Sequence, residues 1–352
     1  GAFERGTSAL EGYDGTTFAR DGIVFVSLNY RLGAEGFSVL DGVPRNLGLL
    51  DVAAAVEWVY REITAFGGDP EMVTLMGESA GGALVAAAVS LPRIGERVHG
   101  AIIQSGPLDA SSPERAGRVT RAIAKHLGIP VTRDSFAAVS PQRLVDARLE
   151  IARKSSPVPT GGFALSLDPD SVPRPPEEAL TDAAAPVLIG TNTDEYRLWL
   201  SPTAIAELGP VKVAGLALLA RIPVGAMRSA RAAGFRGAEA LGQALSDKIL
   251  RAPATRVANA RPDRTFVYEF AWRSPVRGLL AAHAVEIAFA FGRVNGPDAE
   301  SLSGTGAPQT LADEMHSAWV SFIRTGDPGW ASFGGSRTTR VFDEVSETTP
   351  QR

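Results

Sequence analysis

The sequence predicts an α/β fold, with a mostly parallel central sheet and helices on both of its faces. Short apolar runs of strand character alternate with segments of helical periodicity between residues 23 and 103, which is typical of parallel strands joined by crossover helices. Hydrophobic residues make up 45% of the 352 residues, enough for one large domain or two small ones with a sizeable core.

The first five elements follow in the order strand, helix, strand, helix, strand. Residues 23–28 read Ile-Val-Phe-Val-Ser-Leu, a run that predicts a strand buried on both faces. Apolar residues recur at helical spacing over residues 50–63, and Gly67 and Pro70 predict the end of that helix. Next we expect a strand at residues 72–76, an Ala- and Val-rich helix to about Leu91, and a short buried strand at residues 101–103.

The middle of the chain has a different character. Residues 108–182 and 196–260 are rich in helical pattern, proline and arginine, and we interpret them as helical insertions on either side of a strand at residues 187–189. A later strand is expected at residues 265–270, and an amphipathic helix at residues 311–324. We interpret residues 1–352 as a single domain that carries these insertions.

Composition and charge exclude several classes of protein. The chain has 35 Lys and Arg against 39 Asp and Glu, a net charge of -4 without the basic stripe of a nucleic-acid binder. No apolar run approaches the roughly 18–20 residues that a membrane helix needs. The lack of cysteine excludes disulfides, a thiolate nucleophile and a cysteine zinc site. We therefore expect a cytoplasmic protein, a monomer or weak homodimer, that acts on a small molecule rather than on nucleic acid or a membrane.

One motif carries a candidate nucleophile. Residues 77–81 read Gly-Glu-Ser-Ala-Gly and match the pattern G-x-S-x-G, here placed between an expected strand and an expected helix. In an α/β-hydrolase this pattern forms a sharp, strained turn, and the small residues Gly77 and Gly81 let strand and helix approach closely. Such a turn exposes Ser79 above the helix N-terminus, which favours a nucleophile over a helix-capping serine.

A serine nucleophile needs an imidazole base. The chain has four histidines: His99, His126, His283 and His316. His283 follows a late strand in a loop that belongs at the active edge of the sheet, and it fits the chain order nucleophile, acid, base. The acid is expected just after the strand at residues 187–189, where both Asp194 and Glu195 are available. Spacing alone leaves the choice between these two carboxylates open.

Short motifs extend over almost the whole chain. They comprise residues 29–33 (Asn-Tyr-Arg-Leu-Gly), 46–51 (Asn-Leu-Gly-Leu-Leu-Asp), 66–70 (Phe-Gly-Gly-Asp-Pro), 104–106 (Gln-Ser-Gly), 190–195 (Gly-Thr-Asn-Thr-Asp-Glu), 283–287 (His-Ala-Val-Glu-Ile) and 325–328 (Thr-Gly-Asp-Pro). In kind and order they resemble the type B carboxylesterases, the branch of the α/β-hydrolases that includes the bacterial p-nitrobenzyl esterases and the cholinesterases. The resemblance implies a serine hydrolase that cleaves carboxylic esters through an acyl-enzyme intermediate, without a metal or organic cofactor.

The resemblance extends to individual residues of the site. It implies Ser79 as the nucleophile, His283 as the base and Glu195 as the acid. Glu286 and Ser105 match a buried pair that braces the loop of the base. A buried carboxylate needs a partner, so a structural role is expected for this pair.

The resemblance places the oxyanion hole at the start of the chain. The matching donors are the backbone N–H groups of Gly1, Ala2 and Ala80, with Phe3 as the flanking aromatic residue. Members of the family carry further sheet strands before this turn, so we expect the domain to lack its N-terminal strands. The two helical insertions are expected to roof a pocket for a small to medium, largely hydrophobic ester.

Two alternatives stay open. The same three residues would also cleave a carbamate, amide or thioester bond, because leaving-group preference depends on the shape of the pocket. Some members of the family are adhesion or binding proteins that retain the fold without the chemistry, and the intact set of three residues argues against that class.

Overall fold

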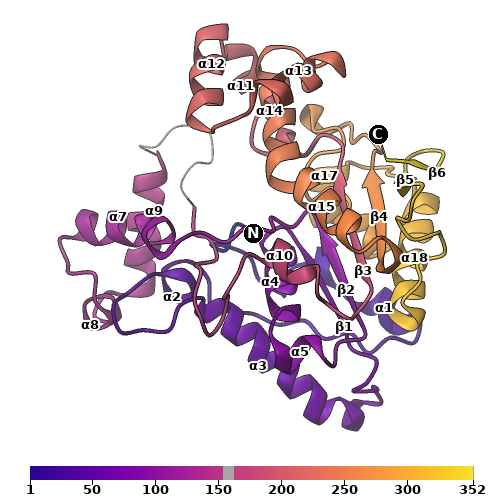
Figure 1. Ribbon diagram of the computed structural model, residues 1–352, viewed down its shortest axis with the longest axis horizontal. Helices are drawn as coiled ribbons and strands as arrows, with labels where there is room; N and C mark the ends of the chain where they lie inside the picture. Colours follow the sequence, from indigo (N-terminus) through magenta and orange to yellow (C-terminus); the bar gives the residue numbers. More distant parts are fainter. Residues whose placement is uncertain (154–161, 352) are drawn as a thin grey trace.

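The computed structural model describes residues 1–153 and 162–351, and its centre is one six-stranded sheet (Figure 1). The strands lie side by side in chain order: β1 Thr74–Glu78, β2 Gly100–Gln104, β3 Val187–Asn192, β4 Thr265–Phe270, β5 Thr338–Phe342 and β6 Glu347–Pro350. The first five strands run parallel, and β6 pairs antiparallel with β5. This arrangement confirms the predicted α/β class with a mostly parallel sheet.

Helices connect and surround the strands. In chain order they are α1 Thr16–Arg20, α2 Gly33–Phe37, α3 Leu47–Glu62, α4 Ala80–Val89, α5 Pro92–Gly95, α6 Pro113–Ala116, α7 Arg118–Leu127, α8 Arg133–Ala137, α9 Pro141–Arg153, α10 Pro176–Leu180, α11 Pro202–Glu207, α12 Pro210–Leu219, α13 Val224–Ala232, α14 Gly237–Ser246, α15 Ala252–Ala260, α16 Ile287–Ala290, α17 Pro297–Ser303 and α18 Gln309–Thr325. Helices α6 to α9 and α11 to α14 project to two different sides of the sheet in Figure 1.

Both faces of the central strands β2 to β4 are buried: alternate side chains point to opposite faces, and helices cover each face. In β2, Ala101 and Ile103 pack with the valines of α4 and α15, whereas Ile102 packs on the other face. That second face is covered by α18, whose Trp319 and neighbouring aromatic residues are fully buried. The near-continuous apolar runs of the central strands are therefore explained by burial on two sides.

Most of the predicted elements are confirmed. The helix predicted at residues 50–63 is α3, and Gly67 follows it with a φ of 81°, a left-handed conformation that suits glycine. The strand predicted at residues 265–270 coincides with β4. β1 lies later than the predicted 72–76, so the strand leads directly into Ser79.

The strand predicted at residues 23–28 is wrong. These residues are extended, but they pair with no other strand in the part of the chain that the structure describes. Val24 and Val26 remain 41% and 42% exposed, so the run is not buried on both faces. A cavity of about 650 Å³ is lined by this segment together with the half-buried strand β1. The run is apolar as predicted, but among the described residues no strand pairs with it.

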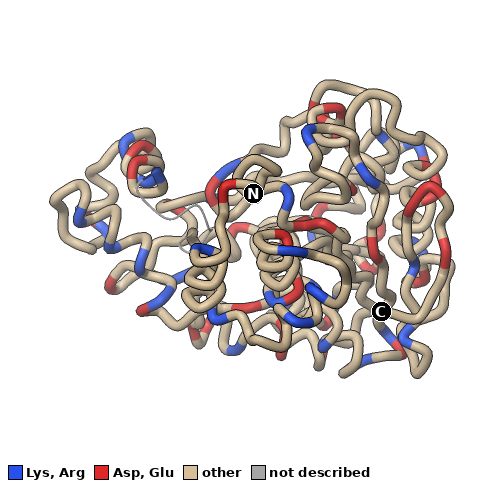
Figure 2. Tube along the Cα trace, turned by 90° about the horizontal axis from the view of Figure 1, so that it is seen from above, with Lys and Arg blue, Asp and Glu red and all other residues tan. Residues whose placement is uncertain are grey.

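Charged side chains are distributed without segregation. Lys and Arg are interspersed with Asp and Glu along the trace (Figure 2). Within residues 1–153 and 162–351, no helix is long and apolar enough to cross a bilayer.

Candidate active site

Ser79 occupies a strained turn between the last residue of β1 and the first residue of α4. Its backbone has a φ of 55° and a ψ of −122°, outside the regions that a residue with a side chain ordinarily adopts. Its N–H donates to the carbonyl oxygen of Gln104 (2.8 Å), which fixes the turn against the neighbouring strand. A Cβ at Gly77 would lie 2.4 Å from the backbone of Gly81, so glycine is needed where strand and helix meet. The sequence prediction of a strained serine turn is thus confirmed in its local geometry.

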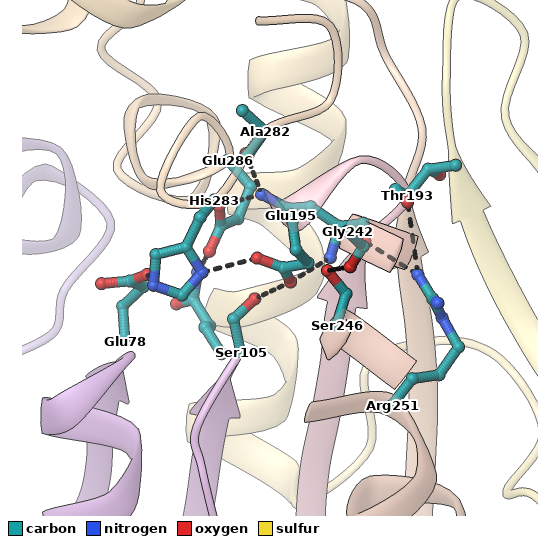
Figure 3. Close-up of polar contacts among 12 residues, drawn as sticks. Glu78, Ser105, Thr193, Glu195, Gly242, Ser246, Arg251, Ala282, His283 and Glu286 are labelled. Carbon is teal, nitrogen blue, oxygen red and sulfur yellow. Dashed lines mark hydrogen bonds and ion pairs between the residues drawn. The ribbon is translucent and has the colours of Figure 1, made fainter. Parts of the chain in front are cut away.

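The structure brings His283 and Glu195 together. Nδ1 of His283 lies 2.5 Å from Oε2 of Glu195, and the Glu195 side chain is fully buried (Figure 3). The other oxygen of Glu195 accepts hydrogen bonds from the Ser105 hydroxyl (2.6 Å) and the Asn192 N–H (2.7 Å). These two donors hold the carboxylate so that Oε2 faces the imidazole.

Asp194 is the second acid that residue spacing allowed as the partner of the histidine. Its carboxylate does not contact the imidazole of His283 in the described residues. Its carboxylate lies 3.7 Å from the guanidinium of Arg197, and its backbone N–H donates to Ala281. A short 3-10 turn begins at Glu195, so the two neighbouring side chains leave the backbone in different directions.

The remaining histidines have other surroundings. His316 is buried in α18, where its ring nitrogens contact the carbonyl of Ala290 and the carboxylate of Asp21. His126 lies beside Glu150 on the surface of α7. His283 is therefore the histidine that shares a site with Glu195.

Ser105 and Glu286 were expected to act as a pair that supports the loop of His283, but in the structure they contact different residues. Ser105 supports Glu195, whereas Glu286 accepts hydrogen bonds from Asn192 Nδ2 (2.6 Å) and Gln104 Nε2 (3.3 Å). The Asn192 amide also donates to the carbonyl of Ala282, next to the base. The sequence analysis did not predict these contacts of Gln104 and Asn192. A polar residue at the carboxyl end of each apolar strand was the feature that could have indicated them.

Glu78 is a further contact of the base that sequence reasoning missed. Its Oε1 lies 3.0 Å from Nε2 of His283, on the side of the ring opposite Glu195 (Figure 3). Its position directly before the serine of the G-x-S-x-G motif could have indicated that Glu78 lies close to the site. The indole of Trp199 packs edge-on against the same imidazole, with ring centroids 5.1 Å apart.

The start of the chain forms a turn close to this site. Ala2 and Phe3 have positive φ values of 56° and 60°, and the carbonyl of Phe3 accepts a hydrogen bond from Gly33 N–H (2.7 Å). The ring of Phe3 packs on Phe37, with centroids 4.8 Å apart. Gly1 and Glu78 line the same cavity.

Comparisons with known proteins agree with this geometry. The model of the "Carboxylesterase family" matches residues 1–210, and the chain is 34% identical over 346 residues to the para-nitrobenzyl esterase of Bacillus subtilis (strain 168). That alignment covers 93% of this chain and 70% of the relative. The chain belongs to the carboxylesterase family.

A solved structure and a second sequence relative extend the comparison. The carboxylesterase of Geobacillus stearothermophilus at pH 6.2 has a TM-score of 0.87 and 31% identity, covering 99% of this chain and 78% of that one. The phenmedipham hydrolase of Pseudarthrobacter oxydans is 29% identical over 348 residues, covering 93% of this chain and 69% of the relative. The protein therefore has the α/β-hydrolase fold and is a carboxylic ester hydrolase.

Burial and charge act in opposite directions on the pKa of His283 in this carboxylesterase. Burial by itself lowers the pKa of His283, but the charges of Glu78 and Glu195 and their contacts with the ring raise it well above its usual value. Burial also raises the pKa of Glu286, from 4.5 to about 8, with the charges of Glu78 and Glu195 adding to the effect. Burial thus favours the protonated form of Glu286.

We expect Glu286→Gln to remove a pH-dependent loss of stability. Between pH 4.5 and about 8 the unfolded chain releases the Glu286 proton while the folded chain retains it. The parent protein therefore loses stability as pH rises through this window, by on the order of a few kcal/mol, and the neutral amide does not. Urea unfolding of both proteins at about pH 5 and about pH 8 measures the difference. Parallel changes in the two proteins would contradict it.

Proposed function

We propose that Ser79, His283 and Glu195 are the catalytic triad of this esterase. The Ser79 oxygen attacks the ester carbonyl while Nε2 of His283 takes its proton, and the imidazolium then protonates the departing alcohol. Water activated by the same histidine hydrolyses the acyl-enzyme and restores Ser79. The observation that carries the proposal is the 2.5 Å contact between Glu195 and His283, at the sheet edge where the strained Ser79 turn also lies.

We assign the oxyanion hole to the backbone N–H groups of Gly1, Ala2 and Ala80. Ala80 is the first residue of α4, where free N–H groups and the helix dipole favour negative charge. The positive φ values at Ala2 and Phe3 place these residues in a turn outside helix and strand, where the Gly1 nitrogen donates to the carbonyl of Arg5. A substrate oxyanion at this turn would therefore have to replace the Arg5 carbonyl as the acceptor from Gly1. Each such donor contributes about 3 kcal/mol to stabilising the oxyanion.

The substrate that we propose is a small to medium, largely hydrophobic ester. Trp199, at the start of the second insertion, supplies an apolar wall beside the imidazole. Arg148 of the first insertion pairs with Glu4 (2.9 Å), close to the turn at Gly1, so both insertions reach the surroundings of the site. The name of the Bacillus subtilis relative makes p-nitrobenzyl esters the first candidates. Location in the cytoplasm stays a prediction.

Ester turnover combined with active-site labelling tests this proposal. Hydrolysis of p-nitrophenyl acetate and butyrate, and of a p-nitrobenzyl ester, would be measured before and after treatment with a fluorophosphonate. Peptide mass spectrometry would then locate the label, which we expect on Ser79 with complete loss of turnover. Labelling elsewhere would overturn the triad, and faster turnover of matched carbamates, amides or thioesters would overturn the ester assignment.

We also propose that a further strand of the same sheet, contributed by polypeptide upstream of Gly1, occupies the cavity beside β1. The support is that, within residues 1–153 and 162–351, β1 pairs with a strand on one side only and the extended residues 23–30 pair with none, and that Gly1 lines the same cavity. In a chain extended upstream from its own gene, amide hydrogen exchange in residues 23–30 and 74–78 should slow. Unchanged exchange in both segments would reject this proposal.

A further inference from the structure

The helices α11 to α14 of the second insertion have a hydrophobic core of their own. Side chains of α12, α13 and α14 pack together in it, among them Val213, Met227 and Leu241, and this cluster is separate from the two that cover the faces of the sheet. In Figure 1, α11 to α13 form the outermost part of the insertion, and α14 leads back to the body of the molecule. Because this core lies on the inner faces of the helices, their outer faces are not needed for it.

Helix α12 is apolar on its outer face as well as on its inner face. Lys212 is the one charged residue in its sequence Pro-Val-Lys-Val-Ala-Gly-Leu-Ala-Leu-Leu. Val211 and Leu218 are seven residues apart, on one side of the helix, and they are 84% and 81% exposed. Leu219 beside them is 63% exposed. A surface helix ordinarily presents polar residues on its outer face, and a helix that is apolar all round is ordinarily covered.

Helix α13 combines an exposed apolar residue with basic ones. Val224, at its first turn, is 68% exposed, and Arg228 and Arg231 follow at helical spacing on the same side and are also exposed. Arg221, between α12 and α13, is exposed too. These side chains together are called the outer patch, which comprises Val211, Leu218, Leu219 and Val224 with Lys212, Arg221, Arg228 and Arg231.

The positive charge of this part of the chain is not compensated. Residues 202–246 contain two acidic side chains, Glu207 and Glu239, and Glu239 pairs with Arg197, which precedes these residues (2.6 Å). The whole chain, by contrast, has a net charge of -4. The basic side chains that form no ion pair with a described residue are Lys212, Arg221, Arg228, Arg231 and Arg236.

The combination of exposed apolar side chains and uncompensated positive charge favours one kind of partner. An anionic phospholipid surface offers an apolar layer to aliphatic side chains and phosphate groups to Lys and Arg. A second copy of the chain would place like charges opposite one another, which opposes association. Nucleic acid would pair with the basic side chains but would leave the valines and leucines exposed. Peripheral binding of this kind needs no helix that crosses the bilayer.

We propose that the outer patch docks this protein on an anionic lipid surface. Val211, Leu218, Leu219 and Val224 enter the boundary between headgroups and acyl chains, and the basic side chains contact the phosphates. The docking itself goes beyond the proposed function and does not depend on it. Its consequence for catalysis does rest on the proposed function: the second insertion, as part of the roof of the pocket, would hold the pocket beside lipid in which hydrophobic esters dissolve.

The test is sedimentation of the whole chain with lipid vesicles. Vesicles of phosphatidylcholine alone are compared with vesicles of equal parts phosphatidylcholine and phosphatidylglycerol. The parent should bind the anionic vesicles on the order of 10²-fold more tightly, since each basic side chain near the surface contributes about fivefold. In about 1 M salt, where the Debye length falls to about 3 Å, most of this difference should be lost.

Two variants divide the apolar contribution from the charged one. Leu218→Asn should weaken binding to the anionic vesicles by on the order of 10-fold, because it removes one buried aliphatic side chain from the docked state. Arg228→Gln should weaken it by about fivefold. Both side chains are exposed, so urea unfolding of the variants should match that of the parent.

Matched controls change the same kinds of residue elsewhere on the surface. Val345→Asn alters a side chain that is 83% exposed between β5 and β6, and Arg133→Gln alters an exposed arginine of α8 in the first insertion. Both should bind the anionic vesicles as the parent does. Equal weakening by the controls and the patch variants would overturn the inference, and so would a folded parent that does not bind anionic vesicles.

Analytical ultracentrifugation and ester turnover distinguish the remaining outcomes. A dimer that forms with rising concentration and is lost in Leu218→Asn, without vesicle binding, would assign the patch to a second copy and overturn the lipid proposal. In the absence of vesicles, Leu218→Asn and Arg228→Gln should hydrolyse p-nitrophenyl butyrate at the parent rate. Vesicle binding by a parent without ester turnover would support the docking and refute the proposed function.

Discussion

Replacement of Ser79 by alanine is expected to lower kcat for p-nitrophenyl butyrate by about 10⁶-fold, to the level that binding and the oxyanion donors alone provide. In the proposed triad, the Ser79 hydroxyl oxygen is the atom that forms the acyl-enzyme. The fold should persist, because alanine meets the same backbone strain that serine already bears at a φ of 55°. Steady-state kinetics and the loss of fluorophosphonate labelling measure the effect.

A serine at the other end of the same helix is the matched control. The Ser90 hydroxyl donates to the carbonyl of Ala86 (2.8 Å), away from the catalytic turn. Ser90→Ala should change kcat less than twofold, since this bond contributes only about 1 kcal/mol to stability. If folded Ser79→Ala retained more than about a hundredth of the parent kcat, another nucleophile would have to be found.

Glu195→Gln is expected to lower kcat by about 10⁴-fold while leaving the fold intact. Ser105 and the N–H of Asn192 both donate to Oε1, so the amide oxygen takes that position. The amide nitrogen then faces Nδ1 of His283 and donates to it, which selects the ring tautomer with the proton on Nε2. That tautomer cannot accept the Ser79 proton.

The neighbouring carboxylate provides the control for this substitution. Asp194 is 4% exposed and lies in the same turn, but it faces Arg197 rather than the imidazole. Kinetics of folded Asp194→Asn should stay within about tenfold of the parent, because the lost ion pair is with Arg197 and not with His283; any cost falls mainly on stability. Equal losses in the two variants would mean that disturbance of the turn, rather than contact with His283, explains both.

Local chemistry made the strained serine turn predictable from sequence. The strained Ser79 turn depends on residues within a few positions of it, namely a strand before it, a helix after it, and Gly77 where a Cβ would meet Gly81. Strand and helix periods are likewise short-range properties, so α3 and β4 were predicted close to their observed bounds.

The spacing of residues in the sequence did not predict the longer-range contacts of the site. Asp194 and Glu195 are adjacent in sequence, and only the direction in which each side chain leaves the 3-10 turn separates their roles. The resemblance to carboxylesterases favoured Glu195, and the structure places that residue against His283. The division of Ser105 and Glu286 between two groups was not predicted, because it depends on Gln104 and Asn192 at the ends of two different strands.

The sequence by itself determined the α/β class, the order of α3, β1, α4 and β2, the serine turn and the family. Each of these depends on periodicity or on residues that are close together in the chain. Only the tertiary structure decided that residues 23–28 lack a strand partner and that Glu78 lies on Nε2 of His283. Both depend on which residues lie beside a segment in space. The pattern of apolar and polar residues indicates that a segment is to be buried, but it does not identify the neighbouring residues that bury it.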